Sequence, residues 1–255
     1  MNEQRIKTIL NNHPWAARVR CEETAASTND IVKILAAQGA PEGTAVFAER
    51  QTAGRGRLGR SFYSPAETGL YFSVLLRPER PARELLDLTA RVAVCVRRAI
   101  SEVCGVEVCI KWVNDLCLNG KKIGGILTEL TGGTNPAAVV GVGINCNQPE
   151  FPQELSGIAG SVFSGSGVTV DRETLAAACL RQLSALYDTD WLAEYRAYCV
   201  SLQKPVKILS AQGEREAFAE DVTDTAALLV RYPDGSREEI FSGEVSVRGL
   251  YGYLP

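Results

Sequence analysis

The order of apolar and polar residues along this chain follows two periods, which predicts both helices and strands. Residues 70–76 form a run of mainly apolar side chains that is typical of a strand. Residues 81–103 place apolar side chains on one face at helical spacing, which predicts a core helix. Further helices are predicted at residues 3–12, 171–186 and 191–200, and further strands at residues 18–21, 44–48, 106–112 and 138–145.

A helix start is predicted where Ser27-Thr28-Asn29-Asp30 precedes apolar residues at helical spacing, with Gly39 as the stop signal. A short hydroxyl side chain suits the N-cap position because it accepts a hydrogen bond from a free backbone N–H. Hydroxyl and amide groups at a helix start can also bind a small polar ligand. Both interpretations apply to this segment.

Glycines mark two features of the predicted strands. Asn119-Gly120 separates two strand patterns and is a strong signal for a tight hairpin turn. Gly141 and Gly143 interrupt the strand predicted at residues 138–145. A glycine weakens a strand and often marks the close approach of a ligand or of another backbone, so we expect such an approach here.

The character of the chain changes after Gln203. Residues 148–168 are a connection rich in Pro, Gly and Ser, and two predicted helices follow it. Beyond Gln203, short strand patterns alternate with turns such as Pro233-Asp234-Gly235, which predicts a small β-barrel-like module. We therefore predict two domains, residues 1–203 and residues 204–255.

The composition is typical of a globular protein that makes no broad contact with nucleic acid or membrane. Hydrophobic residues make up 45% of the chain and charged residues 22%, and the net charge is −3. The N-terminus lacks an apolar signal segment, and the apolar run at residues 137–144 is far too short to span a membrane. We predict a cytoplasmic protein.

The cysteines and the single histidine limit the chemistry that the chain can perform. Its eight cysteines form no Cys-x-x-Cys pair, and several lie in apolar strand or helix patterns, so we interpret them as reduced core thiols. His13 is the only histidine. One histidine and no paired cysteines argue against a catalytic zinc site and against a His-dependent triad, and no metal-binding residue is predicted.

The most polarised stretch is residues 49–60, which hold three glycines and four arginines against a single acid. Glycine permits close backbone approach, and arginine supplies a fork of donors for carboxylate or phosphate. We therefore predict a mobile loop that closes over an anion, although a solvated basic loop is the alternative. Gly54, Gly56 and Gly59 match the dinucleotide fingerprint, but no helix is predicted after them, so that interpretation fails.

Five stretches in this order resemble the biotin protein ligase family. They are Ser27-Thr28-Asn29, residues 51–60, Lys111-Trp112-Val113-Asn114-Asp115, residues 122–129 and residues 141–145. The Gly/Arg loop and the Lys-Trp-x-Asn-Asp segment are specific in combination. Residues 243–248 are similar to the closing strand of the family's SH3-like C-terminal domain, so the resemblance covers nearly the whole chain.

The resemblance implies an α+β fold, with a mixed-sheet catalytic domain of the class II synthetase/biotin–lipoate ligase type and a small SH3-like β-barrel. The implied enzyme is an ATP-dependent ligase that converts biotin to biotinyl-5′-AMP and transfers biotin to a lysine of a biotin carboxyl carrier protein. Biotin and ATP with Mg²⁺ are the implied substrates. Only 26 residues precede Ser27. We therefore expect the ligase-only type without a DNA-binding domain, as a monomer or weak homodimer.

The resemblance also implies roles for individual residues. The implied contacts of biotin are Ser27, Thr28, Asn29, Gln51, Arg55, Gly56, Arg57 and Lys122. The implied contacts of ATP are Arg60, Lys111, Asn114 and Asn145. The implied catalytic residues are Arg57, Lys122 and Asp115, of which Asp115 faces the incoming lysine.

Three other functions fit the sequence less well. A lipoate–protein ligase shares the fold, but the polar cluster of Ser27-Thr28-Asn29 and Gln51 suits a ureido ring better than a long apolar chain. A nucleic-acid-binding regulator that uses the Arg loop conflicts with the net charge of −3. An inactive binding module conflicts with the intact set of nucleotide-side residues.

Overall fold

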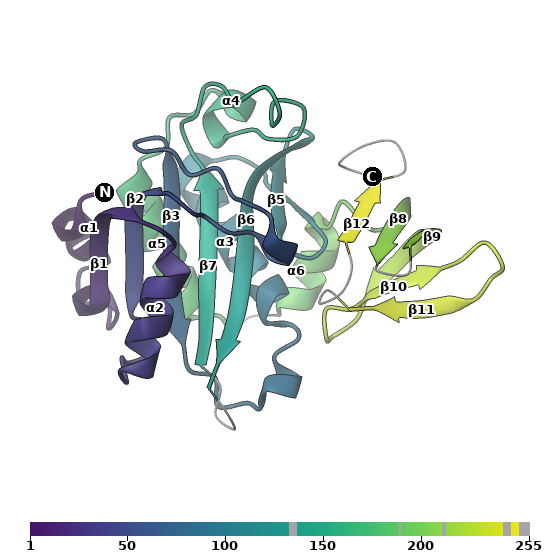
Figure 1. The fold of residues 1–255 in the computed structure, drawn as a ribbon, viewed down its shortest axis with the longest axis horizontal. Helices are drawn as coiled ribbons and strands as arrows, with labels where there is room; N and C mark the ends of the chain where they lie inside the picture. Colours follow the sequence, from purple (N-terminus) through teal and green to yellow (C-terminus); the bar gives the residue numbers. More distant parts are fainter. Residues whose placement is uncertain (133–136, 189, 211–212, 242–245, 250–255) are drawn as a thin grey trace.

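The computed structural model describes residues 1–132, 137–188, 190–210, 213–241 and 246–249. Within these residues the chain forms a seven-stranded mixed sheet with helices on both faces and a separate five-stranded antiparallel sheet (Figure 1). The predicted α+β class is therefore confirmed. None of the described helices has the length and apolar composition needed to cross a membrane.

The large sheet has the strand order β1-β2-β3-β7-β6-β5-β4. Strands β1 and β2 are parallel, and the other neighbours are antiparallel. The bounds are β1 (Val19–Ala25), β2 (Ala45–Gln51), β3 (Gly69–Leu76), β4 (Cys109–Lys111), β5 (Asp115–Leu118), β6 (Lys121–Thr131) and β7 (Ala137–Asn145).

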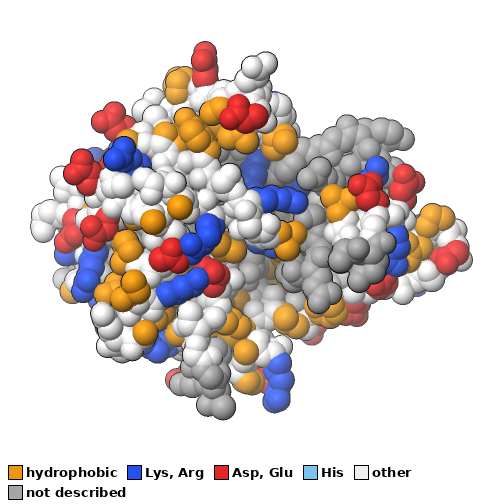
Figure 2. Space-filling view, viewed as in Figure 1, with side chains coloured by type: hydrophobic (Ala, Val, Ile, Leu, Met, Phe, Trp, Pro, Cys, Tyr) orange, Lys and Arg blue, Asp and Glu red, His pale blue; other side chains and the backbone are white. Residues whose placement is uncertain are grey.

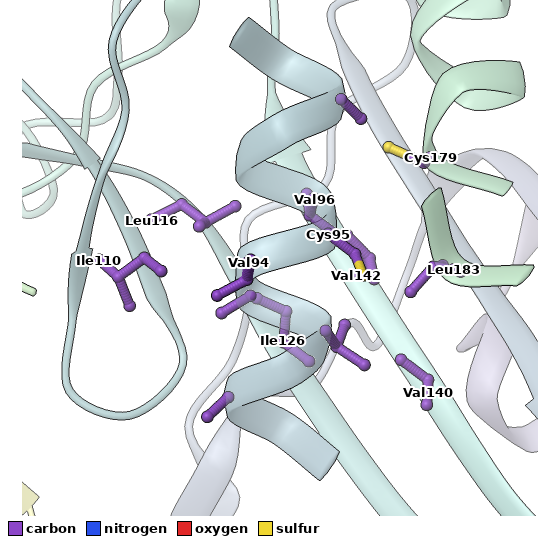
Figure 3. Packing of buried hydrophobic residues seen from close by; sticks show 14 of the residues in the cluster. Val94, Cys95, Val96, Ile110, Leu116, Ile126, Val140, Val142, Cys179 and Leu183 are labelled. Carbon is purple, nitrogen blue, oxygen red and sulfur yellow. The ribbon is translucent and has the colours of Figure 1, made fainter. Parts of the chain in front are cut away.

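Helices cover the two faces of this sheet unequally. The helix α2 (Thr28–Ala37) packs on β2, β3 and β7 through a small apolar cluster that includes Val32. On the opposite face lie α1 (Glu3–Leu10), α3 (Leu88–Cys104), α5 (Arg172–Ser184) and α6 (Trp191–Tyr198). In Figure 3, Val94 of α3 lies on the side of Ile110 and Leu116, and Cys95 and Val96 lie on the side of Val142 and of Cys179 in α5. Because β3 is buried on both faces, its apolar run does not alternate with polar residues.

Several local predictions are confirmed. Asn119 and Gly120 have positive φ values of 47° and 79° in a tight turn between β5 and β6. The helix predicted at residues 171–186 is present as α5, and its N-cap Asp171 accepts a hydrogen bond from the backbone N–H of Thr174. The eight cysteines are all free thiols, and five of them are buried.

Some predicted segments differ from the structure in their bounds or content. The helix predicted from residue 81 begins at Leu88, because a short 3₁₀ helix, Ala82–Glu84, precedes it. The strand predicted at residues 106–112 is limited to β4, since Lys111 pairs with Asp115 across a tight reversal of the chain. The connection at residues 148–168 contains the short helix α4 (Val162–Ser166), which Ser161 caps with a capping box.

The second sheet has the order β11-β10-β9-β8-β12. Its bounds are β8 (Lys204–Ser210), β9 (Gly213–Val222), β10 (Leu228–Arg231), β11 (Arg237–Ile240) and β12 (Ser246–Gly249). Residues 243–245 of the predicted closing strand lie outside the described residues.

Direct contacts join the second sheet to the large one. Arg196 of α6 makes a two-point ion pair with Asp221 at 2.7 and 2.8 Å. The indole N–H of Trp112 donates to the carbonyl of Ala226 at 3.0 Å. Buried apolar residues of both sheets belong to one continuous core. The Lys111–Asp115 reversal is therefore held between the two sheets.

Candidate active site

One cavity of about 860 Å³ lies beside the N-terminus of α2, strands β6 and β7, and the loop that follows β2. It gathers every site residue predicted from the sequence, although these residues are spread over more than a hundred positions of the chain. The residues are Ser27, Thr28, Asn29, Gln51, Arg55, Gly56, Arg57, Arg60, Lys111, Asn114, Asp115, Lys122 and Asn145.

The cavity is strongly cationic although the chain as a whole is not. Its lining includes five basic side chains, Arg55, Arg57, Arg60, Lys111 and Lys122, and two carboxylates, Asp115 and Glu154. Figure 2 shows Lys and Arg side chains near the centre of this face, beneath a band of hydrophobic side chains. A cavity with this charge suits an anionic ligand.

One end of the cavity is polar and organised by hydrogen bonds. Ser27 occupies the predicted N-cap position of α2, but its side chain makes no capping hydrogen bond. Instead, Gln51 Oε1 accepts from the backbone N–H of Thr28 at 2.9 Å, and Gln51 Nε2 donates to Ser64 Oγ at 3.2 Å. The amide of Gln51 therefore takes over the capping role, and the hydroxyl of Ser27 lines the cavity.

Behind this end, Asn29 connects two side chains, Ser73 and Glu129, to which the sequence analysis gave no role. Ser73 Oγ donates to Asn29 Oδ1 at 2.5 Å, and Asn29 Nδ2 donates to Glu129 Oε2 at 2.7 Å. Ser73 is fully buried. A lone serine within the apolar strand β3 was a usable signal, because a buried hydroxyl requires a hydrogen-bond partner.

The centre of the cavity holds two cations with fixed partners. Lys122 Nζ lies 2.5 Å from Asp115 Oδ1. Arg57 Nη1 donates to Asn114 Oδ1 at 3.0 Å, and Asn114 Nδ2 donates to the carbonyl of Ile126 at 2.9 Å. Burial lowers the pKa of Arg57 from its ordinary value. The Arg57 guanidinium therefore lies in a partly dehydrated site, where a charge interacts more strongly than in water.

Two other predicted residues have distinct surroundings. Arg55 makes a two-point ion pair with Asp30, at 2.8 and 2.5 Å, which fixes it against the first turn of α2. Asn145 donates to the carbonyl of Gly160 at 2.9 Å, and its Oδ1 is buried without a hydrogen-bond partner among the described residues. Asn145 lines the cavity, and its Oδ1 is an acceptor that no described group uses.

The two glycines of β7 make room for side chains of this same chain. A Cβ atom at Gly141 would lie 2.3 Å from Asn29 Oδ1, and one at Gly143 would lie 2.6 Å from the ring of Phe62. A close approach is present at both positions, but the approaching groups are side chains that line the cavity, whereas a ligand or another backbone was expected.

An apolar part of the lining was missed by sequence reasoning. Phe62, Tyr63, Phe151, Leu155 and Ile158 all line the cavity, and the rings of Tyr63 and Phe151 meet edge to face with centroids 6.3 Å apart. Three of these residues come from the connection that was predicted only as a linker. Val247 of β12 also lines the cavity, so the second sheet contributes to the site.

Comparison with known proteins agrees with this geometry. Residues 22–147 match the biotin/lipoate A/B protein ligase family, and residues 202–248 match the biotin protein ligase C-terminal domain. These two regions contain every cavity residue discussed above except Phe151, Glu154, Leu155 and Ile158.

Relatives extend the match over most of the chain. The bifunctional ligase/repressor BirA of Bacillus spizizenii is 35% identical, over 97% of this chain and 79% of its own length; its Bacillus subtilis counterpart is matched over 63% of its length. The biotin–[acetyl-CoA-carboxylase] ligase of Paracoccus denitrificans is 33% identical, over 80% of this chain and 90% of its own.

A solved structure shows the same fold. The biotin protein ligase from Aquifex aeolicus, in complex with biotin and ATP, superimposes with a TM-score of 0.77 and 30% identity, covering 91% of this chain and 98% of that one. The identities, the coverage and the shared fold show that this chain belongs to the biotin protein ligase family.

Proposed function

We propose that this chain activates biotin with ATP to give biotinyl-5′-AMP and pyrophosphate, and then transfers biotin to a lysine of a biotin carboxyl carrier protein. The observation that carries this proposal is that a single cavity joins a polar, hydrogen-bonded end to a cationic centre. The polar end suits the ureido ring of biotin, and the cationic centre suits the carboxylate and the phosphate that must approach each other.

The polar end supports biotin binding. Ser27, Thr28 and Gln51 offer hydroxyl and amide groups beside one another, and hydrogen bonds fix the side chains of Thr28 and Gln51 before a ligand arrives. Preorganised polar groups discriminate strongly, because a ligand that lacks the matching donor or acceptor leaves them unpaired. Asn29 belongs to the same end but is engaged by Ser73 and Glu129, so it supports the pocket from behind.

The cationic centre supports the adenylation step. A carboxylate oxygen of biotin attacks the α-phosphorus of ATP, the new C–O–P bond forms, and pyrophosphate leaves. Two anions approach in this step, and charge accumulates on the phosphate oxygens. Lys122 and Arg57 stabilise that charge, with Arg55 and Gly56 contributing to the loop over the biotin tail.

The remaining lining supports nucleotide binding. Arg60, Lys111, Asn114 and Asn145 offer donors and an unpaired acceptor to ATP. ATP enters as its Mg²⁺ complex, in which the ion is held mainly by phosphate oxygens. The apolar side chains of Phe151, Leu155 and Ile158 give the adenine ring a wall to pack against. The cavity thus has a region for each part of the adenylate.

In the transfer step the ε-amine of a carrier lysine attacks the carbonyl carbon of biotinyl-5′-AMP, and AMP leaves. Asp115 lies in the cavity beside Lys122 and is the carboxylate placed to orient the incoming amine. We propose a biotin carboxyl carrier protein of acetyl-CoA carboxylase or of a similar carboxylase as the partner. The cytoplasmic location, the monomeric or weakly dimeric state and the absence of DNA binding remain predictions from sequence.

The substrate assignment is tested by ATP–pyrophosphate exchange. We expect biotin to support exchange and lipoate to support none, because the polar end of the cavity matches a ureido ring and not a dithiolane chain. The assay uses labelled pyrophosphate with each acid at equal concentration. Exchange with lipoate that equals exchange with biotin would assign the chain to the lipoate branch of the fold.

The role of Lys122 is tested by Lys122→Ala. Without its ammonium group, repulsion between Asp115, the biotin carboxylate and the phosphate is unscreened, so we expect adenylation to lose about 2 kcal/mol or more of transition-state stabilisation. The control is Lys7→Ala, which removes another ion-paired lysine, on α1 and outside the cavity. Single-turnover adenylation at the wild-type rate in Lys122→Ala would exclude this role.

The role of Arg57 is tested by following the fate of the intermediate in Arg57→Gly. Ordering the Gly/Arg loop over a ligand costs roughly 1 kcal/mol per residue, and Arg57 contributes the contact to the phosphate that offsets this cost. We expect weaker binding of biotin and adenylate, and release of biotinyl-5′-AMP that labels an unrelated bystander protein.

The matched control is Leu58→Gly. Leu58 has φ 56° and a half-exposed side chain, so a glycine fits its backbone and adds flexibility without removing a cation. A biotin blot of the bystander protein should show labelling by Arg57→Gly and not by Leu58→Gly or the wild type. Negligible labelling by Arg57→Gly, together with full biotinylation of the carrier, would show that Arg57 does not retain the intermediate.

A further inference from the structure

A hydrogen-bonded chain of side chains leads from the surface to the polar end of the cavity. Lys33 Nζ lies 2.6 Å from Glu129 Oε1, and Glu129 Oε2 accepts from Asn29 Nδ2 at 2.7 Å. Ser73 then bridges Asn29 and Thr28, with oxygen distances of 2.5 Å to Asn29 Oδ1 and 2.7 Å to Thr28 Oγ1. Of these side chains, Asn29 and Thr28 line the cavity.

The sheet provides the space for this chain of contacts. Ser73, Gly141 and Leu127 are in register on the neighbouring strands β3, β7 and β6. Because Gly141 lacks a Cβ atom, the Asn29 amide lies over the middle strand and reaches Ser73 on one side and Glu129 on the other. A larger residue at position 141 would occupy the place of Asn29 Oδ1.

The charge of Glu129 sets the direction of every hydrogen bond in the chain. Burial raises the pKa of Glu129, but hydrogen bonds from Lys33 and Asn29 outweigh it and hold the pKa below its usual value. The group is therefore a carboxylate at neutral pH and only accepts. The Glu129 carboxylate requires a donor, so the NH₂ group of Asn29 points toward Glu129 and Asn29 Oδ1 faces Ser73.

The remaining directions follow from counting hydrogens. The Ser73 hydroxyl has one hydrogen and donates it to Asn29 Oδ1, so Ser73 Oγ must accept from Thr28. Thr28 thereby commits its single hydrogen to the 2.7 Å contact with Ser73, in preference to Gln51 Oε1 at 3.3 Å. Toward the cavity, Thr28 Oγ1 then presents lone pairs only.

We infer that Glu129, paired with Lys33, is a positioning residue that fixes Thr28 Oγ1 as an acceptor for a ureido N–H group of biotin. This inference rests on the proposed function, and it concerns how the same site selects its substrate. The ureido ring offers two N–H donors, and an acceptor fixed in advance matches one of them. The Glu129–Lys33 pair is partly exposed, and such pairs add little to stability, so its effect falls on ligand binding.

The test measures biotin affinity and its dependence on the ureido hydrogens. Glu129→Gln keeps the size of the side chain but adds an amide donor, so Asn29 can turn over and Thr28 can redirect its hydrogen. We expect about tenfold weaker biotin binding by titration calorimetry, with an unchanged KM for ATP and an unchanged thermal unfolding temperature. The control is Glu220→Gln, which removes a carboxylate that accepts from Arg231 and Arg237 outside the cavity.

Two biotin analogues, each methylated at one ureido nitrogen, distinguish positioning from a general effect on structure. The quantity compared is the loss of affinity that methylation causes in the wild type and in the variant. For one analogue, methylation should weaken binding to the wild type several-fold more than binding to Glu129→Gln, since the variant no longer holds an acceptor for the lost hydrogen. Lys33→Met, which removes the cation from the chain, should shift both readouts in the same direction and serves as the second variant.

The possible outcomes separate the two claims. A wild type that binds no biotin and catalyses no biotin-dependent pyrophosphate exchange would overturn the proposed function, and this inference with it. The positioning role of Glu129 would be overturned, with the proposed function intact, by either of two results. One is that the wild type and the variants bind biotin with equal affinity, and the other is that methylation of the ureido nitrogens weakens binding to both by the same factor.

Discussion

Two anions have to meet in the cavity of this protein, and their mutual repulsion is the constraint on which the site depends. A carboxylate and a triphosphate repel each other more strongly in a partly dehydrated cavity than in water, so fixed cations are required. Lys122 beside Asp115, and Arg57 beside Asn114, supply them. Both pairs depend on the same short reversal of the chain, residues 111–115.

The fold holds this reversal from two sides. Pairing of Lys111 with Asp115 closes it within the large sheet, and Trp112 contacts Ala226 next to the second sheet. Tyr195 of α6 donates to the carbonyl of Val113 at 3.2 Å. Because Val247 of the second sheet also lines the cavity, the C-terminal module forms part of the wall of the site.

Local signals made much of the fold predictable. The Asn119-Gly120 turn, the start of a helix at Asp171 and the apolar run of β3 are signalled by neighbouring residues, and each of these predicted elements is present. The bounds of α3 and β4 were wrong because a separate 3₁₀ helix, Ala82–Glu84, precedes α3, and because the pairing of Lys111 with Asp115 ends β4.

The candidate site was predictable where residue types are unusual and adjacent, as in the Gly/Arg loop. It was not predictable where the partner lies on another element. Ser73 and Glu129 are connected to the site by their hydrogen bonds to Asn29 of α2, and the spacing of the three residues in the sequence does not indicate these contacts. Phe151 and Ile158 were missed because a connection rich in Pro, Gly and Ser gives no period from which to infer a shared surface.

The central claim is that one cavity holds biotin and nucleotide end to end, with their junction between Arg57 and Lys122. A crystal structure of the protein with a stable analogue of biotinyl-5′-AMP tests it directly. The account predicts the ureido ring at Thr28 and Gln51, the phosphate within hydrogen-bonding distance of Arg57 and Lys122, and the adenine ring against Phe151 and Ile158. A phosphate bound away from both cations, or a ureido ring outside the polar end, would contradict it.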